Sequence, residues 1–262
     1  MAADQYFTEC MAEIRQPIMR IYQWQPWCIS LGYHQKSQCL DLNRCRKSGI
    51  DVVRRQTGGR AVFHAEEIAY SVILPVGHPL ATSVSQTYQQ ISLGLAAGIQ
   101  TLGIQASFQK RQVNLKSHYK KKIASSCFSA AALHEIVVHN RKLVGSAQRR
   151  MPTGILQHGS ILIGSAHQQL FRYMKQLPDR EVKIMEKELS DKTTCICEWI
   201  RSVPLNATIA SALKTGMAGT LGIQFEDKAI TLDELQEIDI LKHKFSILKG
   251  AEKADGFVIN NE

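Results

Sequence analysis

The sequence predicts an α+β fold, in which helices pack on a mixed β-sheet and a small helical extension forms the C-terminal part. Three observations lead to this prediction. Short apolar segments of strand length, bounded by glycine and proline, fill much of residues 18–74 and recur in residues 135–163. One long amphipathic segment separates these two groups. After about residue 165 the apolar spacing becomes helical.

The first half of the chain alternates between helices and strands. Residues 1–14 are expected to form a helix, because apolar side chains recur along one of its faces. A short helix is expected to begin near Ser37 and to end near Gly49, since glycine favours the position that follows a helix. Residues 56–59 read as a glycine turn between two strands. The expected strands are residues 18–24, 28–32, 50–54, 60–64 and 68–74.

The second half begins with a long amphipathic helix over residues 83–102, which Gly103 closes. Further on, Thr231 and Glu234 have the spacing of a capping box, which predicts the start of another helix. The expected strands of this half are residues 135–138, 141–147 and 155–163, of which the first two form a hairpin with His139 and Asn140 in its turn.

Length and composition are those of a soluble globular protein. The chain has 262 residues, 44% hydrophobic and 21% charged. We expect a single domain over residues 1–250, with its helical part from about residue 165, and a tail over residues 251–262. No apolar run approaches the ~18 residues of a membrane-spanning helix. The first residues do not resemble a signal peptide, so no membrane partner is expected.

The seven cysteines are odd in number and scattered through the chain. This usage favours reduced thiols and a cytoplasmic location. Cys195 and Cys197 are close in sequence, but no matching Cys or His pair lies near them, so no metal site is expected.

The formal net charge of +9 suits nucleic acid, a membrane surface or an acidic protein equally well. One stretch of basic residues is either a solvated loop or a docking patch for an acidic carrier. Nucleic acid is a less favoured partner than an acidic carrier, because Phe108 and Tyr119 are the only aromatic residues in this stretch that could stack on bases. The basic residues are Lys110, Arg111, Lys116, Lys120, Lys121 and Lys122.

The segment from Cys127 to Ser160 narrows the function most. A lysine, Lys142, follows Cys127 by fifteen positions, and glycine-marked segments surround it. The thiolate is the reactive form of cysteine, and a nearby ammonium group favours that form. A cysteine and lysine of this kind are the parts needed for thiol-based acyl transfer. Without the flanking motifs, a buried structural cysteine would be the more common outcome.

Residues 54–64 are the second informative stretch. Gly58 and Gly59 lie between two expected strands, where they permit positive φ angles and close approach of a ligand to the backbone. An ordinary glycine hairpin is the alternative. The stretch is neither a P-loop nor a dinucleotide-binding motif, because the glycine spacing of both is absent.

Together these segments resemble the biotin/lipoate A/B protein ligase superfamily. Within it they most resemble the cysteine-dependent octanoyltransferases that act on glycine-cleavage H proteins and lipoyl domains. The matching segments run in order over nearly the whole chain: Met1-Ala-Ala-Asp, Ser30-Leu-Gly-Tyr, residues 54–64, Tyr70-Ser71-Val, Cys127-Phe, residues 141–148 and residues 156–160.

The resemblance implies that Cys127 forms an acyl-thioester and that Lys142 lowers its pKa. ATP-dependent lipoate ligases of the same superfamily also have a matching lysine, so Cys127 is the residue that indicates a transferase. Where family members often carry Pro-Ser after the cysteine, this chain has Ala131 and Ala132. The implied acyl and substrate site consists of Arg54, Gly58, Gly59, His64, Ser71, Gly145, Ala147, His158 and Gly159.

The implied reaction moves an octanoyl group from acyl carrier protein to Cys127, and then to a lysine of an H protein or an E2 lipoyl domain. It requires no ATP and no cofactor. Backbone N–H groups at Gly58–Gly59 and His158–Gly159 are candidates for stabilising the oxyanion. His64 and His158 are candidates for proton transfer, although a structural role is at least as common for a histidine. Acceptors and donors of this class are generally acidic, so Lys120, Lys121 and Lys122 are expected to dock them.

Three alternatives remain open at this point. The first is an ATP-dependent lipoate or octanoate ligase. The second is an amidotransferase that relays octanoyl from an H protein to another lipoyl domain with the same cysteine chemistry. The third is a non-catalytic basic protein that binds nucleic acid or a carrier.

Overall fold

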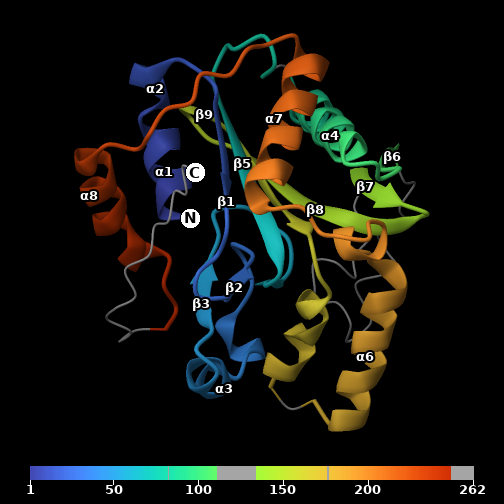
Figure 1. The fold of residues 1–262 in the computed structure, drawn as a ribbon. Helices are drawn as coiled ribbons and strands as arrows, with labels where there is room; N and C mark the ends of the chain where they lie inside the picture. Colours follow the sequence, from blue (N-terminus) through green and yellow to red (C-terminus); the bar gives the residue numbers. More distant parts are fainter. Residues whose placement is uncertain (82, 111–133, 176, 249–262) are drawn as a thin grey trace.

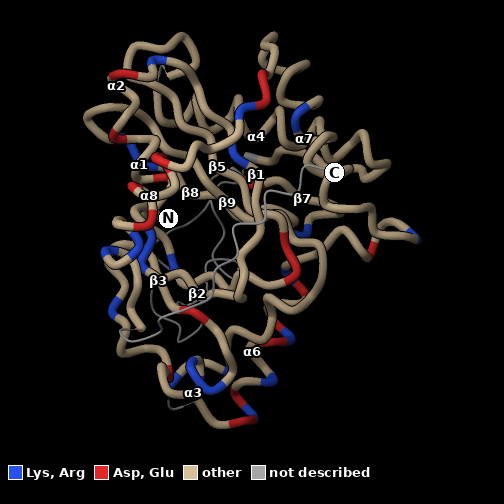
Figure 2. Tube along the Cα trace, turned by 60° about the vertical axis from the view of Figure 1, so that its left-hand side comes forward, with Lys and Arg blue, Asp and Glu red and all other residues tan. Residues whose placement is uncertain are grey.

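The structure is a computed structural model that describes residues 1–81, 83–110, 134–175 and 177–248 (Figure 1). Cys127, the docking lysines Lys120, Lys121 and Lys122, and the expected tail over residues 251–262 lie outside the described residues. The expected α+β architecture is confirmed: a large sheet and a small sheet are surrounded by helices (Figure 1 and Figure 2).

The large sheet has six strands, and each strand is antiparallel to its neighbours. β5 lies between β1 and β9, and all nine of its residues are buried because both faces of the sheet are covered. In spatial order the strands are β1 (Ile18–Tyr22), β5 (Glu67–Pro75), β9 (Gly154–Leu162), β8 (Arg141–Arg150), β7 (His134–Val138) and β6 (Ser107–Lys110).

The expected hairpin at the start of β8 is confirmed. Its turn contains His139 and Asn140 with φ angles of 45° and 62°, the left-handed pair that a tight two-residue turn requires. β8 continues to Arg150, three residues beyond the expected end, and then turns into β9. The edge strand β6 was not expected from the sequence.

The small sheet corrects one prediction. It consists of β3 (Asp51–Arg54), β2 (Cys28–Leu31) and β4 (Val62–His64), in that order. Because β2 pairs in parallel with β3 and antiparallel with β4, the two strands on either side of Gly58 and Gly59 do not pair with each other. The expected glycine turn is therefore a crossover loop, residues 55–61, that passes the end of β2.

On one face of the large sheet lie α4 (Val84–Thr101) and α7 (Asn206–Leu221), packed against each other (Figure 1). A Cβ atom on Gly216 would lie 2.0 Å from the backbone nitrogen of Gly98, so the two helix backbones are in direct contact. α4 begins where expected, with Ser83 Oγ accepting a hydrogen bond from the Gln86 N–H.

On the opposite face lie α1 (Ala2–Glu9), α2 (Met11–Ile14) and α8 (Leu232–Leu241) (Figure 1). Phe7 and Met11 pack there against Ile73 and Leu156 of the sheet and against Ile238 of α8. The prediction of a single helix over residues 1–14 was wrong in detail. The helix is interrupted at Cys10 and restarts as one short turn.

The C-terminal part is helical, as expected, and the capping box at the start of α8 is confirmed. Within the described residues, no helix combines the length and the apolar character needed to cross a lipid bilayer. The remaining helical elements are η1 (Ser37–Cys39), α3 (Leu42–Lys47), η3 (Ala166–Tyr173), α6 (Asp179–Lys192), η4 (Ile196–Glu198) and η5 (Lys242–Lys244).

Candidate active site

Lys142 is a buried lysine near the start of β8. Its side chain is 8% exposed, and its Nζ lies 3.1 Å from Oε1 of Glu135 on the neighbouring strand β7. The main chain of Lys142 is also fixed, since its carbonyl accepts a hydrogen bond of 3.0 Å from the Thr194 N–H. A charge buried in this way needs a counter-charge, which Glu135 supplies. The ammonium group is therefore held on a rigid strand by an ion pair.

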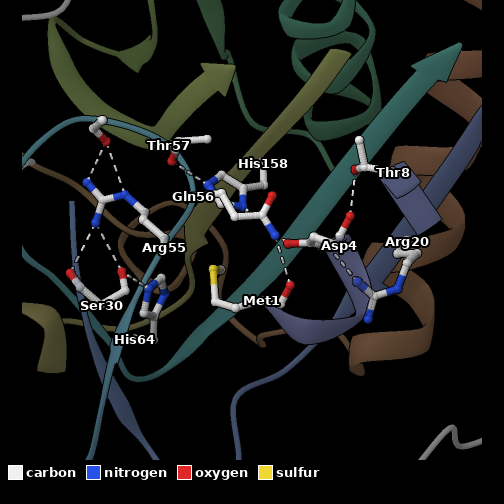
Figure 3. A network of polar contacts seen from close by, with 11 residues as sticks. Met1, Asp4, Thr8, Arg20, Ser30, Arg55, Gln56, Thr57, His64 and His158 are labelled. Carbon is white, nitrogen blue, oxygen red and sulfur yellow. Dashed lines mark hydrogen bonds and ion pairs between the residues drawn. The ribbon is translucent and has the colours of Figure 1, made fainter. Parts of the chain in front are cut away.

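The crossover loop is organised around Arg55, whose side chain is buried (Figure 3). Nη1 donates to the carbonyl and the hydroxyl oxygen of Ser30, at 3.0 and 3.1 Å. Nη2 donates to the carbonyls of Gly58 and Arg60, at 2.9 and 2.6 Å. One guanidinium group thus joins both ends of the loop to strand β2.

His64 extends this network to the large sheet. Its Nε2 lies 2.7 Å from Ser30 Oγ (Figure 3). Its Nδ1 lies 2.6 Å from Oε1 of Glu67 on β5. The other oxygen of Glu67 accepts a hydrogen bond from Ser160 on β9. Trp24 stacks on the imidazole ring, with 4.7 Å between the ring centroids. Both ring nitrogens of His64 are therefore occupied.

A second hydroxyl–imidazole–carboxylate chain holds the middle of the loop. Thr57 Oγ1 lies 2.7 Å from Nε2 of His158, whose Nδ1 lies 3.2 Å from Oδ2 of Asp4 in α1 (Figure 3). The other oxygen of Asp4 accepts a bond of 2.6 Å from Arg20. Each of these three side chains, on Thr57, His158 and Asp4, is buried.

The surroundings of His158 and Asp4 determine the charge that each side chain carries. Burial lowers the pKa of His158, and the hydrogen bond that His158 donates to Asp4 opposes that effect only in part. Burial acts to raise the pKa of Asp4, but the positive groups around it, including Arg20, and the bond to His158 hold it well below its usual range. His158 is therefore neutral and Asp4 ionised near pH 7.

The strand register brings five of the expected site residues together at the centre of the large sheet. Ser71 on β5, His158 on β9 and Ala147 on β8 lie side by side across three strands. Gly159 lies in the adjacent row, opposite Ser146, and Gly145 lies one row further on, opposite Ser160. A Cβ atom on Gly159 would come within 2.4 Å of the Gly145 carbonyl oxygen. Glycine is required at residue 159 because the strands are this close.

Arg54, Gly58 and Gly59 form a separate group at the small sheet. Arg54 donates from Nη1 to the carbonyls of Gly32 and Tyr33, at 3.1 and 3.2 Å, which folds the chain after β2 back against the loop. A Cβ atom on Gly32 would lie 1.9 Å from the Gly59 carbonyl oxygen, whereas one on Gly58 would have no neighbour within 4 Å. Residue 59 also favours glycine, because its φ angle is 96°.

Residues 1–217 match the model of a known protein family, the lipoyl protein ligase A/B catalytic domain. This chain belongs to that family. The match covers both sheets and reaches into α7.

Individual relatives agree with the family assignment. The chain is 36% identical over 233 residues to the octanoyltransferase LipM of Staphylococcus epidermidis, which is 87% of this chain and 84% of that protein. It is 33% identical over 252 residues to the octanoyltransferase LipM of Clostridioides difficile, with 94% and 90% of the two chains covered.

Solved structures of lipoate-protein ligases share the fold. A lipoate-protein ligase A bound with ATP has a TM-score of 0.71 and 21% identity, over 92% of this chain and 87% of that one. A bi-partite lipoate protein ligase from Thermoplasma acidophilum, solved in a study of that ligase and its E2 lipoyl domain, has a TM-score of 0.73 and 20% identity, over 92% and 85%.

The sequence did not predict which residues of this lipoyl protein ligase A/B domain hold the site residues in place through hydrogen bonds and ion pairs. Arg55, Thr57 and Asp4 lie inside the segments that matched the family, but nothing in their spacing indicated the bonds that they make. Glu135 carried a usable signal, because an acidic residue on one strand of a hairpin and a lysine on the other are expected to approach. Glu67 lies three residues after His64, but nothing in that spacing indicated its bonds to His64 and to distant Ser160.

Two further findings concern groups outside the network. The hydroxyl of Ser71 is buried and has no hydrogen-bond partner among the described residues. Within residues 1–81, 83–110, 134–175 and 177–248, no group of three or more His, Cys, Asp or Glu side chains is arranged to hold a metal ion.

Proposed function

We propose that this protein is an octanoyltransferase of lipoate biosynthesis. It takes octanoyl from acyl carrier protein and transfers it to a lysine ε-amine of a lipoyl domain or a glycine-cleavage H protein. The observation that carries the proposal is the identity of 33–36% with relatives named octanoyltransferases, over 84–90% of their length. The buried pair of Lys142 and Glu135 supports it, because it provides an oriented ammonium group on a rigid strand.

In the first step the thiolate of Cys127 attacks the carbonyl carbon of the octanoyl thioester. The Cys127–acyl bond forms, and the carrier leaves as a thiolate. Free cysteine, with a pKa of about 8.5, is only a few per cent thiolate at pH 7. An ammonium group within ~4–6 Å of the sulfur favours ionisation, which is the role proposed for Lys142.

In the second step the amine of the target lysine attacks the enzyme thioester. The amide bond forms, the thiolate of Cys127 leaves, and the amine loses a proton. No ATP is needed, because exchange between thioesters is near energy balance and amide formation is downhill.

Both steps pass through an oxyanion, which needs N–H donors. β9 has partner strands on both sides, so the N–H groups around His158 and Gly159 belong to the sheet ladders. The crossover loop at Gly58–Gly59 is therefore the better of the two candidates.

The histidines are proposed to position the crossover loop and not to transfer protons. His64 has Ser30 and Glu67 on its two ring nitrogens, and His158 has Thr57 and Asp4. The incoming amine therefore cannot bond directly to either ring while these contacts hold. Arg54, Ser71, Gly145 and Ala147 are proposed to complete the acyl and substrate site.

Octanoyl-acyl carrier protein is the proposed donor, and Lys120, Lys121 and Lys122 are proposed to dock both acidic partners. Reversing the charge of these three lysines should slow association and weaken its dependence on salt. An unchanged salt dependence would count against this docking surface.

Intact mass spectrometry after mixing with octanoyl-acyl carrier protein tests the proposal. The wild type should gain about 126 Da, the mass of one octanoyl group replacing hydrogen, as a covalent intermediate. Cys127→Ala should show no adduct, whereas Cys39→Ala, which changes a half-buried cysteine on η1, should keep it. An adduct on the Cys127→Ala variant would contradict the mechanism.

The ATP-dependent ligase is the second candidate, because solved lipoate ligases share this fold. Incubation with free octanoate and ATP, without acyl carrier protein, separates the two activities. Modification of a lipoyl domain under those conditions would favour the ligase. An octanoyl-H protein offered as the sole donor identifies a relay amidotransferase in the same assay.

A further inference from the structure

Cys195 and Cys197 bring two sulfur atoms together outside the candidate site. They flank Ile196 in the short segment between α6 and the end of η4. Their Sγ atoms are 3.3 Å apart. Cys195 is buried at 2% exposure, whereas Cys197 is exposed. One sulfur can therefore meet a reagent from solvent while the other lies directly behind it.

The segment that carries the two thiols is attached to the strand of Lys142. The N–H of Thr194 donates to the Lys142 carbonyl, and Thr193 forms a bridge with Lys142. On the other side, the N–H of Cys197 donates to the Ile163 carbonyl at 3.0 Å. The segment is thus bonded to the main chain of β8 just before Cys195 and to Ile163, next to β9, at Cys197.

A disulfide has its sulfur atoms 2.03–2.05 Å apart, so closing this pair would draw them together by roughly 1.3 Å. The peptide between them contains a single residue, Ile196, which is fully buried. The backbone on either side must therefore adjust. Disulfides that are strained or exposed have the more oxidising potentials that suit reversible use.

We propose that Cys195 and Cys197 form a reversible dithiol–disulfide site, and that its oxidation displaces the segment paired with Lys142. This proposal does not depend on the octanoyl chemistry of Cys127. The oxidant is a peroxide. Exposed Cys197 attacks the peroxide oxygen, which gives a sulfenic acid and releases water or an alcohol. Cys195 then attacks the Cys197 sulfur, the S–S bond forms, and a water molecule leaves.

Overall, two thiols and one peroxide give one disulfide and two hydroxylic products, water among them, and a dithiol reductant reverses the reaction. The order of events follows from the surroundings of the two sulfurs. Burial raises the pKa of the Cys195 thiol, as do neighbouring Cys197 and Glu198, so Cys195 is the poorer first nucleophile.

Tryptic mapping tests the site directly. Cleavage after Lys192 and Arg201 yields a peptide, residues 193–201, that contains both cysteines and no other. After the full-length protein is treated with hydrogen peroxide and free thiols are alkylated, this peptide should be about 2 Da lighter than its reduced form and carry no alkyl group. Dithiothreitol should restore two alkylatable thiols.

The controls come from the same digest. Cys39 lies in a peptide of its own, residues 37–44, and its Sγ donates to the Lys36 carbonyl, so it should show no loss of two hydrogens. In Cys197→Ser, Cys195 should stay alkylatable after unfolding. Retention of both thiols in residues 193–201, oxidation of Cys197 alone to a sulfinic acid, or pairing of either residue with another cysteine would overturn the proposal.

Hydrogen exchange tests the link to Lys142. Peptides from β8 should exchange at least several-fold faster in the peroxide-treated wild type than in the reduced protein. Cys197→Ser treated in the same way should show no change. Equal exchange in oxidised and reduced wild type, with the disulfide confirmed by mapping, would refute the coupling.

Discussion

The hydroxyl of Thr57 lies 2.7 Å from Nε2 of His158, and this contact ties the crossover loop of the small sheet to the centre of the large one. Both residues are buried, so neither polar group can turn to water. The position of the loop is therefore set by the large sheet as well as by its own strands.

Thr57→Val tests this contact. The variant keeps the shape of the side chain but leaves His158 Nε2 without a partner, which should reduce the free energy of unfolding by about 1–3 kcal/mol. Thr57→Ser keeps the hydroxyl and should lose much less. Urea unfolding curves measure both. Equal losses would show that the methyl group, and not the hydrogen bond, matters at this position.

Gly32 and Gly58 provide a matched pair of glycine substitutions. In Gly32→Ala the new methyl group would lie 1.9 Å from the Gly59 carbonyl oxygen, so the loop must move, and octanoyl transfer should fall at least tenfold. Gly58→Ala has open space around the new atom and should fold with unchanged stability. If Gly58→Ala nevertheless loses transfer activity, the acyl substrate contacts the backbone at residue 58. Activity in Gly32→Ala equal to wild type would mean that the position of the loop does not matter.

The buried pair of Lys142 and Glu135 predicts an asymmetric mutational result. Lys142→Met removes the cation and leaves a buried carboxylate, which should cost about 3–5 kcal/mol of stability and abolish transfer. The double variant Lys142→Met with Glu135→Leu should recover most of the stability but none of the activity. Chemical denaturation and the octanoyl-adduct assay distinguish these two effects. Recovery of activity in the double variant would remove Lys142 from the mechanism.

Burial lowers the pKa of His167 to about 4, which predicts acid sensitivity. In the unfolded chain this histidine titrates near pH 6.5, so below that pH the unfolded state binds a proton that the folded state does not. The stability contribution is fully present above pH 6.5 and is lost as the pH falls towards 4, amounting to about 3 kcal/mol. Unfolding free energies of the wild type and His167→Gln, measured from pH 7 to pH 4, should converge as the pH falls. Parallel pH profiles would contradict this origin.

Local patterns in the sequence predicted the elements well. The hairpin at His139–Asn140, the helix that follows Ser83 and the capping box at Thr231 each depend on neighbouring residues, so a short stretch of sequence contains the whole signal. The break at Cys10 went unpredicted because both halves of the helix have the same apolar face.

Pairing between strands that are distant in sequence could not be predicted from such local patterns. Gly58 and Gly59 suggested a hairpin, because the sequence does not reveal that β2 lies between the flanking strands. The same limit applies to the site. Lys142 and the glycines were found by motif. The pairs Glu67–Ser160 and Asp4–His158 span 93 and 154 residues, and only the fold brings them together.

The wide separation of these partners has a consequence for the order in which the protein assembles. The bond between Thr57 and His158 spans 101 residues, and that between His158 and Asp4 spans 154. The crossover loop can become ordered only after α1 and both sheets have docked, so it should be among the last parts to form during refolding.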